Sequence, residues 1–510
     1  MGCAVCAERD GGKEGPIEKT GYSATGGVGV EIHGHVGSLR SLGPILLVHD
    51  LSLGTFVHTV EAADGAGNAD LHTMNPFGDL PVMKDCGEYE VILAHPQAVM
   101  RYLAGRYAAE FYPPESTMRM AFIDWAMDRF EDSLVFDAEA TILVVLGQRE
   151  RPEEPEGVGR ATSSRLQDYA SFFLREKFIG GQALSIADYM VAPYFMCYTH
   201  PALKDIAHVE CPDRVKLYVR DFLATCHSAD LLINAKGFAL KELLDKRGQK
   251  GQLLPPEDQA MELVPEDLFG GMRCGLDRCK LYGASLCLES MGCILAGLDT
   301  RCGEMVPTLP GRDTGAPSFV AMNPFKQVPA LKAGDFAMAE SQAILRFMAQ
   351  AYVPLLYPRD PVVRGRIDCA MAHFQSGGLS KCARETIKPF LTRTEPPDDL
   401  IKAGQSVTSK LREFADHFLG RKWIGGDKLT IADYWVAPFF FAWEHPAVIG
   451  VCQIELPPRI HQFNRDFEIA SPAAAKLTHA GGHSVKEVLD KCAQKSGRTS
   501  FRRSVGPAFV

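Results

Sequence analysis

Four residues in the second half of the chain have the types and spacing to bind a small peptide-like ligand. Val328-Pro329 is an X-Pro pair, in which a cis peptide costs only about 0.5–1 kcal/mol, and Glu340-Ser341 begins a predicted helix 11 residues later (340 − 329 = 11). A cis turn would leave the backbone N–H and C=O of Val328 to pair with an extended ligand. The N–H groups of the helix start and the Ser341 hydroxyl could hold a carboxylate, while Glu340 could hold an ammonium group. The pattern predicts a ligand that carries both charges.

The motif around this proline occurs twice in the chain. The segment Asn75–Pro81 (NPFGDLP) returns as Asn323–Pro329 (NPFKQVP), and Gly180–Tyr189 (GGQALSIADY) returns as Gly425–Tyr434 (GGDKLTIADY). Because both pairs of segments occur in the same order, we interpret the chain as two copies of one unit. Positions at which the copies differ can therefore be compared directly.

The second repeated motif predicts a helix start. Ser185 precedes Asp188 by three residues, and Thr430 precedes Asp433 by the same spacing. The hydroxyl can accept the backbone N–H of the third helical residue, and the carboxylate of that residue can reach back to the N–H of the cap residue. We interpret both pairs as capping boxes with a structural role.

The elements that must position these residues change in kind along each copy. In the second copy we expect a strand with a turn over 279–286, a helix over 291–298, a strand over 327–332 and a helix over 340–351. The last of these has an apolar stripe at helical spacing. Beyond Tyr357-Pro358 the pattern is helical only. Each copy should thus consist of a small α/β domain followed by an all-helical domain.

At 510 residues the chain is too long for one hydrophobic core. We expect an N-terminal arm over 1–29, an α/β domain over 30–112 and a helical domain over 113–250 in the first copy. A Pro-rich acidic linker over 251–278 should lead to the second copy, with an α/β domain over 279–357, a helical domain over 358–494 and a tail over 495–510.

The composition excludes several classes of function. The 54 Lys and Arg residues against 63 Asp and Glu residues give a net charge of −9, which provides no basic field for nucleic acid. The 15 cysteines are scattered, which fits a reducing compartment, and no apolar run is long enough to span a bilayer. No cluster has the spacing of metal ligands, so we expect no metal. A cytoplasmic location follows as the expectation.

Taken together, the motifs resemble the glutathione S-transferase family. The resemblance rests on Lys280–Gly283, Asn323–Pro329, Glu340–Ile344 and Trp423–Asp433, in that order. It implies a thioredoxin-like α/β domain and an all-helical domain, here in tandem, with glutathione as substrate and an apolar pocket for a second substrate. It also implies that glutathione binds to Gln327, Val328, Pro329, Glu340 and Ser341.

The resemblance further implies a position for the catalytic residue. Placing Glu31–Leu39 on Lys280–Leu288 without a gap sets Ser38 opposite Cys287. Serine-type members of the family use a hydroxyl there to stabilise the glutathione thiolate for attack on an electrophile. Cysteine-type members use a thiolate of lowered pKa that forms a mixed disulfide. Ser285 and Ser290 are close enough to replace Cys287 in this role, and Cys287 could instead be a small buried apolar residue.

The two copies differ at the ligand-binding positions. His95-Pro96 stands where the second copy has Glu340-Ser341, and Asp79 stands where the second copy has Gln327. Proline removes a donor N–H, and Asp79 adds a negative charge. We therefore predict that the first copy binds glutathione poorly and that the second keeps the site.

Two functional hypotheses remain from the sequence. One is an enzyme that conjugates glutathione to electrophiles or exchanges thiols and disulfides. The other is a non-catalytic, membrane-associated scaffold built from paired transferase folds. Gly2 is a candidate for myristoylation, with Cys3 and Cys6 as candidates for palmitoylation. Two acyl chains would attach the protein stably to the cytoplasmic face of a membrane. A homodimer is a further expectation, and the second substrate is not encoded in any local motif.

Overall fold

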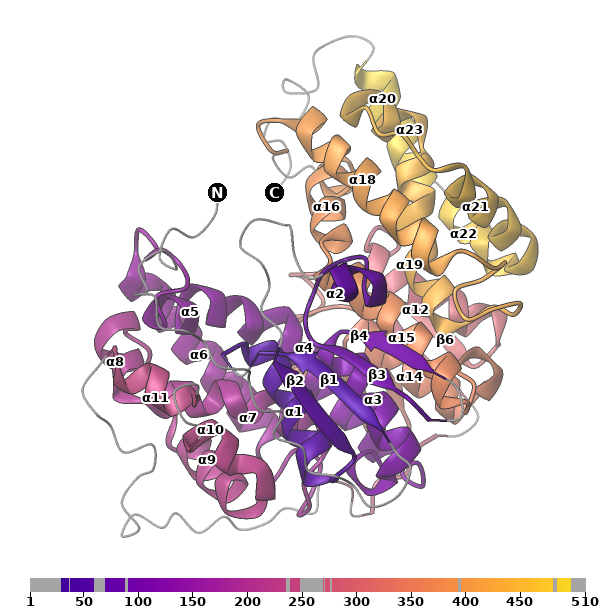
Figure 1. Ribbon diagram of the computed structural model, residues 1–510. Coiled ribbons are helices and arrows are strands. Elements are labelled where there is room, and N and C mark those ends of the chain that lie inside the picture. The colour runs from indigo at the N-terminus through magenta and orange to yellow at the C-terminus, as the bar shows by residue number, and fades with distance from the viewer. Residues whose placement is uncertain are drawn as a thin grey trace. The chain divides into compact units, whose positions relative to one another are not determined.

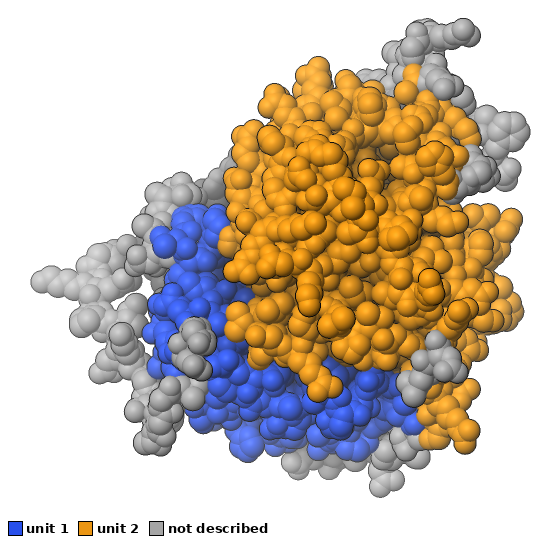
Figure 2. Space-filling model, turned by 90° about the vertical axis from the view of Figure 1, so that its right-hand side faces the viewer, with its two compact units in different colours: residues 1–270 blue, residues 271–510 orange. Residues whose placement is uncertain are grey.

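The computed structural model describes residues 29–35, 37–58, 69–87, 90–234, 239–247, 269, 271–275, 278–392, 396–479 and 484–496. The chain divides into two compact units, residues 1–270 and residues 271–510, which are coloured separately in Figure 2. In both units a four-stranded sheet comes first in the chain, and a set of helices follows it.

The sheet of unit 1 has the strand order β2-β1-β3-β4 (Figure 1). Its central strand β1 (Val30–Gly34) is parallel to β2 (Gly54–His58), and helix α1 (Leu39–Asp50) makes the crossover that a parallel pair requires. The other two pairs are antiparallel. The remaining elements are α2 (Ala69–Met74), β3 (Val82–Asp85), β4 (Val91–Ala94) and α3 (Pro96–Tyr107).

Unit 2 repeats this arrangement with the strand order β6-β5-β7-β8. The central strand β5 (Cys279–Gly283) is parallel to β6 (Gly303–Pro307), again across a twelve-residue helix, α12 (Leu288–Asp299). Alternate residues of β5 are buried, as expected for a strand with two unlike faces. The remaining elements are α13 (Pro317–Met322), β7 (Ala330–Ala333), β8 (Phe336–Ala339) and α14 (Ser341–Ala351).

Helices make up the rest of both units. Unit 1 continues with η1 (Ala109–Phe111), α4 (Thr117–Ala140), α5 (Ile142–Val145), α6 (Pro155–Phe173), α7 (Ile186–Thr199), α8 (Pro201–Ala207), α9 (Asp213–Thr225), η2 (His227–Ala229), α10 (Asp230–Ile233) and α11 (Leu240–Asp245). Unit 2 continues with η3 (Pro354–Leu356), α15 (Pro361–Ser376), α16 (Leu379–Thr386), α17 (Lys388–Thr392), α18 (Leu400–Phe418), α19 (Ile431–Glu444), α20 (Pro446–Cys452), α21 (Pro458–Ala470), η4 (Pro472–Ala474), α22 (Ala475–Thr478) and α23 (Val485–Ser496). The predicted fold class, thioredoxin-like α/β followed by all-helical, is confirmed.

The most buried helix of the helical domain in each unit contacts the sheet domain. Helices α7 and α19 are apolar on nearly all sides, as expected for a helix enclosed by its neighbours. In unit 1, Asp50 at the end of α1 accepts hydrogen bonds from the Tyr189 hydroxyl and the Ser228 N–H. In unit 2, Asp299 accepts one from the Tyr434 hydroxyl at 2.9 Å. The same polar anchor therefore holds the sheet domain against the helical domain in both units.

Both capping boxes form. In α7, the Ser185 N–H and hydroxyl donate to one Asp188 oxygen at 2.7 and 2.8 Å, and the other oxygen accepts the Ile179 N–H. Asp433 makes the same set of contacts at the start of α19. Complete burial raises the pKa of Asp188 and of Asp433 to about 6, although these hydrogen bonds act in the opposite direction.

Some of the sequence predictions fall on residues that the structure does not describe. Gly2, Cys3 and Cys6 lie outside the described residues, as do residues 497–510 of the tail and most of the linker. In the described part of the chain, no helix is both long and apolar enough to cross a membrane. That part also contains no group of three or more His, Cys, Asp or Glu side chains arranged to hold a metal ion.

Candidate functional site

Ser38 and Cys287 occupy the same place in the two units. Each is the N-cap residue of the helix that follows the central strand, α1 for Ser38 and α12 for Cys287. Their backbone torsions nearly coincide, with φ −93° and ψ 110° at Ser38 and φ −93° and ψ 106° at Cys287. A side chain at an N-cap lies beside the unpaired N–H groups of the first helical turn, where a ligand's sulfur could be held.

The two proline motifs also form the same loop. The Leu80-Pro81 and Val328-Pro329 peptide bonds are both cis. In unit 2 the Asn323 side chain donates to the Gln327 carbonyl at 2.8 Å and accepts the Phe325 N–H at 3.1 Å. Asn75 makes the corresponding contacts in unit 1. The asparagine of each motif therefore fixes the loop that precedes the third strand of the sheet.

The helix starts that should bind charged groups differ between the units. Glu340 caps α14 with φ 68°, and His95 caps α3 with φ 78°. Left-handed backbone is costly for residues other than glycine and is frequent at functional sites. Ser341 begins α14 and keeps its N–H, whereas Pro96 begins α3 and has none. The sequence comparison paired Glu340-Ser341 with His95-Pro96, and the structure places both pairs at the start of the corresponding helix.

The surroundings of Cys287 raise the pKa of its thiol. Burial, with the negative charge of Glu289 as the next cause, raises the pKa of the Cys287 thiol to about 12. The thiol donates to the Glu289 carboxylate across 3.4 Å. The N–H and hydroxyl of Ser290 act in the opposite direction and are outweighed. This direction is opposite to the lowered pKa that a cysteine-type site requires. Ser285 lies half-buried two residues before Cys287.

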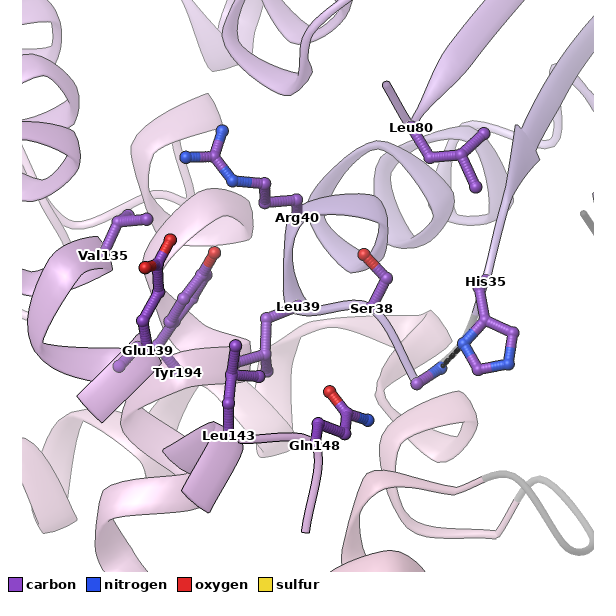
Figure 3. A pocket seen from close by; sticks show the side chains of 12 residues that line it. His35, Ser38, Leu39, Arg40, Leu80, Val135, Glu139, Leu143, Gln148 and Tyr194 are labelled. Atoms are coloured by element: carbon purple, nitrogen blue, oxygen red, sulfur yellow. Dashed lines mark hydrogen bonds between the residues drawn. The ribbon is translucent and has the colours of Figure 1, made fainter. Parts of the chain in front are cut away.

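Unit 1 contains a cavity of about 370 Å³ beside Ser38. Figure 3 shows the Ser38 hydroxyl pointing into it, with Leu80 on one side and residues of α4, α5 and α7 on the other. The lining residues are His35, Gly37, Ser38, Leu39, Arg40, Leu80, Val135, Ala138, Glu139, Leu143, Gln148 and Tyr194. The cavity thus lies between the sheet domain and the helical domain of one unit.

An internal ion pair lies next to this cavity. Arg40 on α1 donates to Glu131 on α4 at 2.7 Å, and the same Glu131 oxygen lies 4.0 Å from Nε2 of His95. The negative charge of Glu131 raises the pKa of Arg40 above its ordinary value. The Glu131 carboxylate therefore lies beside His95, the cap of α3. The corresponding cap in unit 2 is Glu340, which the sequence predicts to contact a ligand.

Unit 2 lacks this carboxylate. The buried pairs Arg101–Asp124 and Arg346–Asp368 lie at matching places in the two units and set an offset of 368 − 124 = 244 between helices α4 and α15. The residue that matches Glu131 is then Gln375 (131 + 244 = 375), which accepts the Ser380 hydroxyl at 2.8 Å. Glu289 matches Arg40 by the ungapped comparison of the first strands.

The sequence analysis does not identify Arg40 and Glu131 as site residues. One signal was available, because the ungapped comparison that pairs Ser38 with Cys287 also pairs Arg40 with Glu289, a reversal of charge two residues after the catalytic position. Glu131 gave no such signal. Its partner is 91 residues away in the chain, and only the folded structure brings the two side chains together.

Comparisons with known proteins were made for the whole chain. The family model described as glutathione S-transferase, N-terminal domain, matches residues 304–350. Glutathione S-transferase theta-3 of Mus musculus is 30% identical over 159 residues, which cover 30% of this chain and 65% of that protein. Glutathione S-transferase 1 of Manduca sexta is 34% identical over 120 residues, which cover 22% of this chain and 52% of that protein. The chain thus matches less than two thirds of the length of these two relatives.

Similar folds occur among solved structures. The theta-class glutathione S-transferase of Xanthomonas axonopodis pv. citri, solved with glutathione bound, is 21% identical to this chain. The match covers 40% of this chain and 99% of that protein, with a TM-score of 0.36.

Proposed function

Because the chain belongs to the glutathione S-transferase family, we propose that unit 2 binds glutathione and conjugates its sulfur to an electrophile. Gln327, Val328, Pro329, Glu340 and Ser341 form the glutathione site, and Cys287 acts at the sulfur. The observation that carries this proposal is the match of the family model over residues 304–350, which contain all five of the predicted binding residues.

Each binding residue has a separate task. The backbone of Val328, beside the cis Pro329, pairs with the extended peptide. The first N–H groups of α14 and the Ser341 hydroxyl hold the carboxylate of the γ-glutamyl end, where the helix dipole favours negative charge. Glu340 holds the ammonium group of that end.

The protonation state of Cys287 favours conjugation over disulfide exchange. A thiol with a pKa of about 12 is a poor nucleophile at neutral pH. Its S–H, which donates to Glu289 in this structure, can turn to donate a weak hydrogen bond to a bound thiolate. Cys287 then performs the task of the serine in serine-type members. Glutathione gives up its thiol proton to solvent, and its sulfur forms the new bond to the electrophile as the leaving group departs.

Unit 1 does not bind glutathione in this proposal. The Glu131 carboxylate lies beside His95, the cap of α3, so it would repel the carboxylate of the γ-glutamyl end. Pro96 at the first helical position provides no N–H to compensate.

Two assays on the full chain test the proposed chemistry. The first follows conjugation of glutathione to 1-chloro-2,4-dinitrobenzene, and the second follows thiol exchange with hydroxyethyl disulfide. We expect conjugation to dominate, to persist in Cys287→Ser, and to fall by about tenfold or more in Cys287→Ala, because one donor to the developing charge is lost. Ser38→Ala is the matched control in unit 1 and should not change the rate. Loss of activity in Ser38→Ala alone would contradict the assignment.

If neither assay shows turnover, the second hypothesis is supported, in which the paired folds form a non-catalytic scaffold. Membrane attachment belongs to both hypotheses. Metabolic labelling with myristate and palmitate should mark the wild-type chain, and Gly2→Ala should lose the myristate label. Sedimentation analysis tests the expected homodimer.

A further inference from the structure

Two cysteines lie side by side in the sheet of unit 2, at the end of β5 that is farther from Cys287. Cys279 is the first residue of β5, and Cys302 directly precedes β6. The Cys279 N–H donates to the Cys302 carbonyl at 2.8 Å, and the Cys279 thiol donates to the same oxygen across 3.4 Å. The two side chains also interact directly with each other. Both cysteines are free thiols in this structure.

Unit 1 has no cysteine at either of these places. The ungapped comparison of the first strands pairs Val30 with Cys279, and the register of the parallel strands pairs Leu53 with Cys302. The backbone contact is shared, because the Val30 N–H donates to the Leu53 carbonyl at 3.3 Å. The fold therefore forms with apolar side chains at both positions, and the two thiols of unit 2 are not needed to build it.

The strand geometry allows a disulfide between Cys279 and Cys302. Neighbouring strands lie about 4.8 Å apart, and the Cα atoms of disulfide-bonded residues usually lie about 4.4–6.8 Å apart. The backbone hydrogen bond between the two residues holds them at the spacing of neighbouring strands. The bond can therefore form by rotation of the two side chains.

Cys302 has the more acidic thiol of the two. The hydrogen bond from the Cys279 side chain lowers the pKa of Cys302, against the opposing effect of burial, and the same interaction raises the pKa of Cys279. The Thr300 hydroxyl lies 3.1 Å from the Cys302 sulfur and 2.6 Å from the Ala296 carbonyl. Its single hydrogen can turn from the carbonyl to a thiolate. These neighbours favour the thiolate of Cys302, which is the form that reacts with peroxides and disulfides.

Cys302 is also the cysteine that lies nearer the edge of the sheet. It is 5% exposed, the preceding residue Arg301 is exposed, and β6 is an edge strand. Cys279 lies on the central strand and is 1% exposed. A small oxidant therefore reaches Cys302 first, and Cys279 is placed to react with the oxidised product.

We propose that hydrogen peroxide oxidises Cys302 and that Cys279 then forms a reversible disulfide with it. The Cys302 thiolate attacks one peroxide oxygen and becomes a sulfenic acid, and the hydroxide that leaves takes up the proton that Cys302 lost. The sulfur of Cys279 then displaces the hydroxyl group, so the S–S bond forms and water is released. Peroxide accepts two electrons from the two thiols. Two molecules of a thiol such as glutathione return the pair to the reduced form and leave as a disulfide.

Mass spectrometry of the full chain after treatment with hydrogen peroxide tests the pairing. The protein is denatured in iodoacetamide to block the remaining thiols, and trypsin then separates the two cysteines into the peptides 279–280 and 302–312. We expect these two peptides to be joined by a disulfide that disappears after treatment with glutathione. A Cys302 that stays alkylatable, or that pairs with another cysteine, would overturn the proposal.

Cys452 is the matched internal control for the rate of oxidation. It is a buried cysteine of unit 2 whose thiol donates to a backbone carbonyl at 3.9 Å, and burial raises its pKa to about 12. We expect peroxide to oxidise Cys302 about tenfold faster or more than Cys452 in the same sample. Equal rates would contradict a specific reactivity of Cys302.

Variants that introduce the unit 1 residues separate the two roles. Cys279→Val removes the second thiol, so the sulfenic acid of Cys302 should persist and give about fivefold or more dimedone adduct than in the wild type. Cys302→Leu removes the attacking thiolate, so Cys279 should give no adduct. An adduct at Cys279 in Cys302→Leu, or none at Cys302 in Cys279→Val, would contradict the assigned order of reaction.

Thr300→Val keeps both cysteines and tests the proposal even if a cysteine variant fails to fold. Loss of the hydroxyl should slow the oxidation of Cys302 by about two- to tenfold, and an unchanged rate would contradict the support that Thr300 gives to the thiolate. Neither cysteine is among the proposed glutathione-binding residues. The disulfide should therefore form on treatment with peroxide even in a chain that fails both glutathione assays.

Discussion

At the scale of single residues, the two units differ in the charge beside the proposed catalytic position. Unit 1 has Arg40 two residues after Ser38, paired with Glu131, and unit 2 has Glu289 two residues after Cys287. A cation there would favour a thiolate and an anion disfavours it. Burial, and Glu289 after it, therefore favour the thiol form of Cys287, which fits a hydrogen-bond donor better than an attacking nucleophile.

Glu289→Gln should lower the pKa of Cys287, because the change removes a negative charge 3.4 Å from the sulfur while burial, the larger cause, remains. The rate of alkylation of Cys287 by iodoacetamide, followed by mass spectrometry against pH, should show its midpoint at lower pH than in the wild type. Glu304→Gln removes an exposed charge from β6 and is the control. An unchanged or higher midpoint in Glu289→Gln would show that the carboxylate does not set the protonation state.

Arg40→Met should destabilise unit 1 by about 1–3 kcal/mol, because it leaves a largely buried Glu131 without its charged partner. The double variant Arg40→Met with Glu131→Gln should recover most of the loss, since both charges are then gone. Chemical denaturation of the single and double variants forms a double-mutant cycle. Additive losses would mean that the pair contributes nothing as a pair.

At the scale of elements, what could be predicted depends on how far apart the partners lie in the chain. The capping boxes, the proline loops and the change from an α/β domain to an all-helical domain were predictable, because each depends on residues within a short segment. The predicted helix over 291–298 proved to start three residues earlier, at Leu288, because Cys287 serves as its cap. The cavity and the Arg40–Glu131 pair were not predictable, because they join helices far apart in the chain.

Replacing either capping carboxylate should lower the free energy of unfolding. Asp433→Asn replaces an acceptor oxygen by a donor, so at pH 7 it should destabilise unit 2 by about 1–3 kcal/mol. Asp188→Asn should do the same to unit 1. Denaturation of each variant beside the wild type measures both effects, and a change below about 0.5 kcal/mol would contradict the role of the box.

The pH dependence of this effect follows from the raised pKa. The folded-state pKa of Asp433 is about 6 against an ordinary 3.8, so the folded protein holds the proton between these values. The stability that this group contributes is fully present below about pH 4 and is lost as the pH rises through 6. The two pKa values differ by 6 − 3.8 = 2.2, which corresponds to about 3 kcal/mol in the free energy of unfolding. As the pH falls from 7 to 4, the free energy of unfolding of the wild type should therefore rise relative to that of Asp433→Asn. A constant or shrinking difference would contradict the raised pKa.

At the scale of the whole molecule, one fold is used twice with unequal sites. The strand order, the capping boxes and the aspartate anchors at Asp50 and Asp299 are the same in both units. The residues around the ligand are not, because Glu131 and His95 in unit 1 correspond to Gln375 and Glu340 in unit 2. The contacts that build the fold are thus shared by the units, and the residues at the proposed ligand-binding positions are not.

Calorimetric unfolding of the full chain can assign ligand binding to a unit. Asp188→Asn and Asp433→Asn should lower the unfolding temperature of different transitions, which identifies unit 1 and unit 2. Glutathione at about 100 times its Kd should stabilise by about 2.7 kcal/mol only the transition that Asp433→Asn lowers. A shift of the other transition would place the glutathione site in unit 1.

Isothermal titration of the full chain with glutathione tests the inequality of the two sites most directly. The account predicts one glutathione per chain, with binding lost in Glu340→Ala and kept in the matched variant His95→Ala. Two glutathione molecules per chain, or binding that survives Glu340→Ala and disappears in His95→Ala, would contradict it.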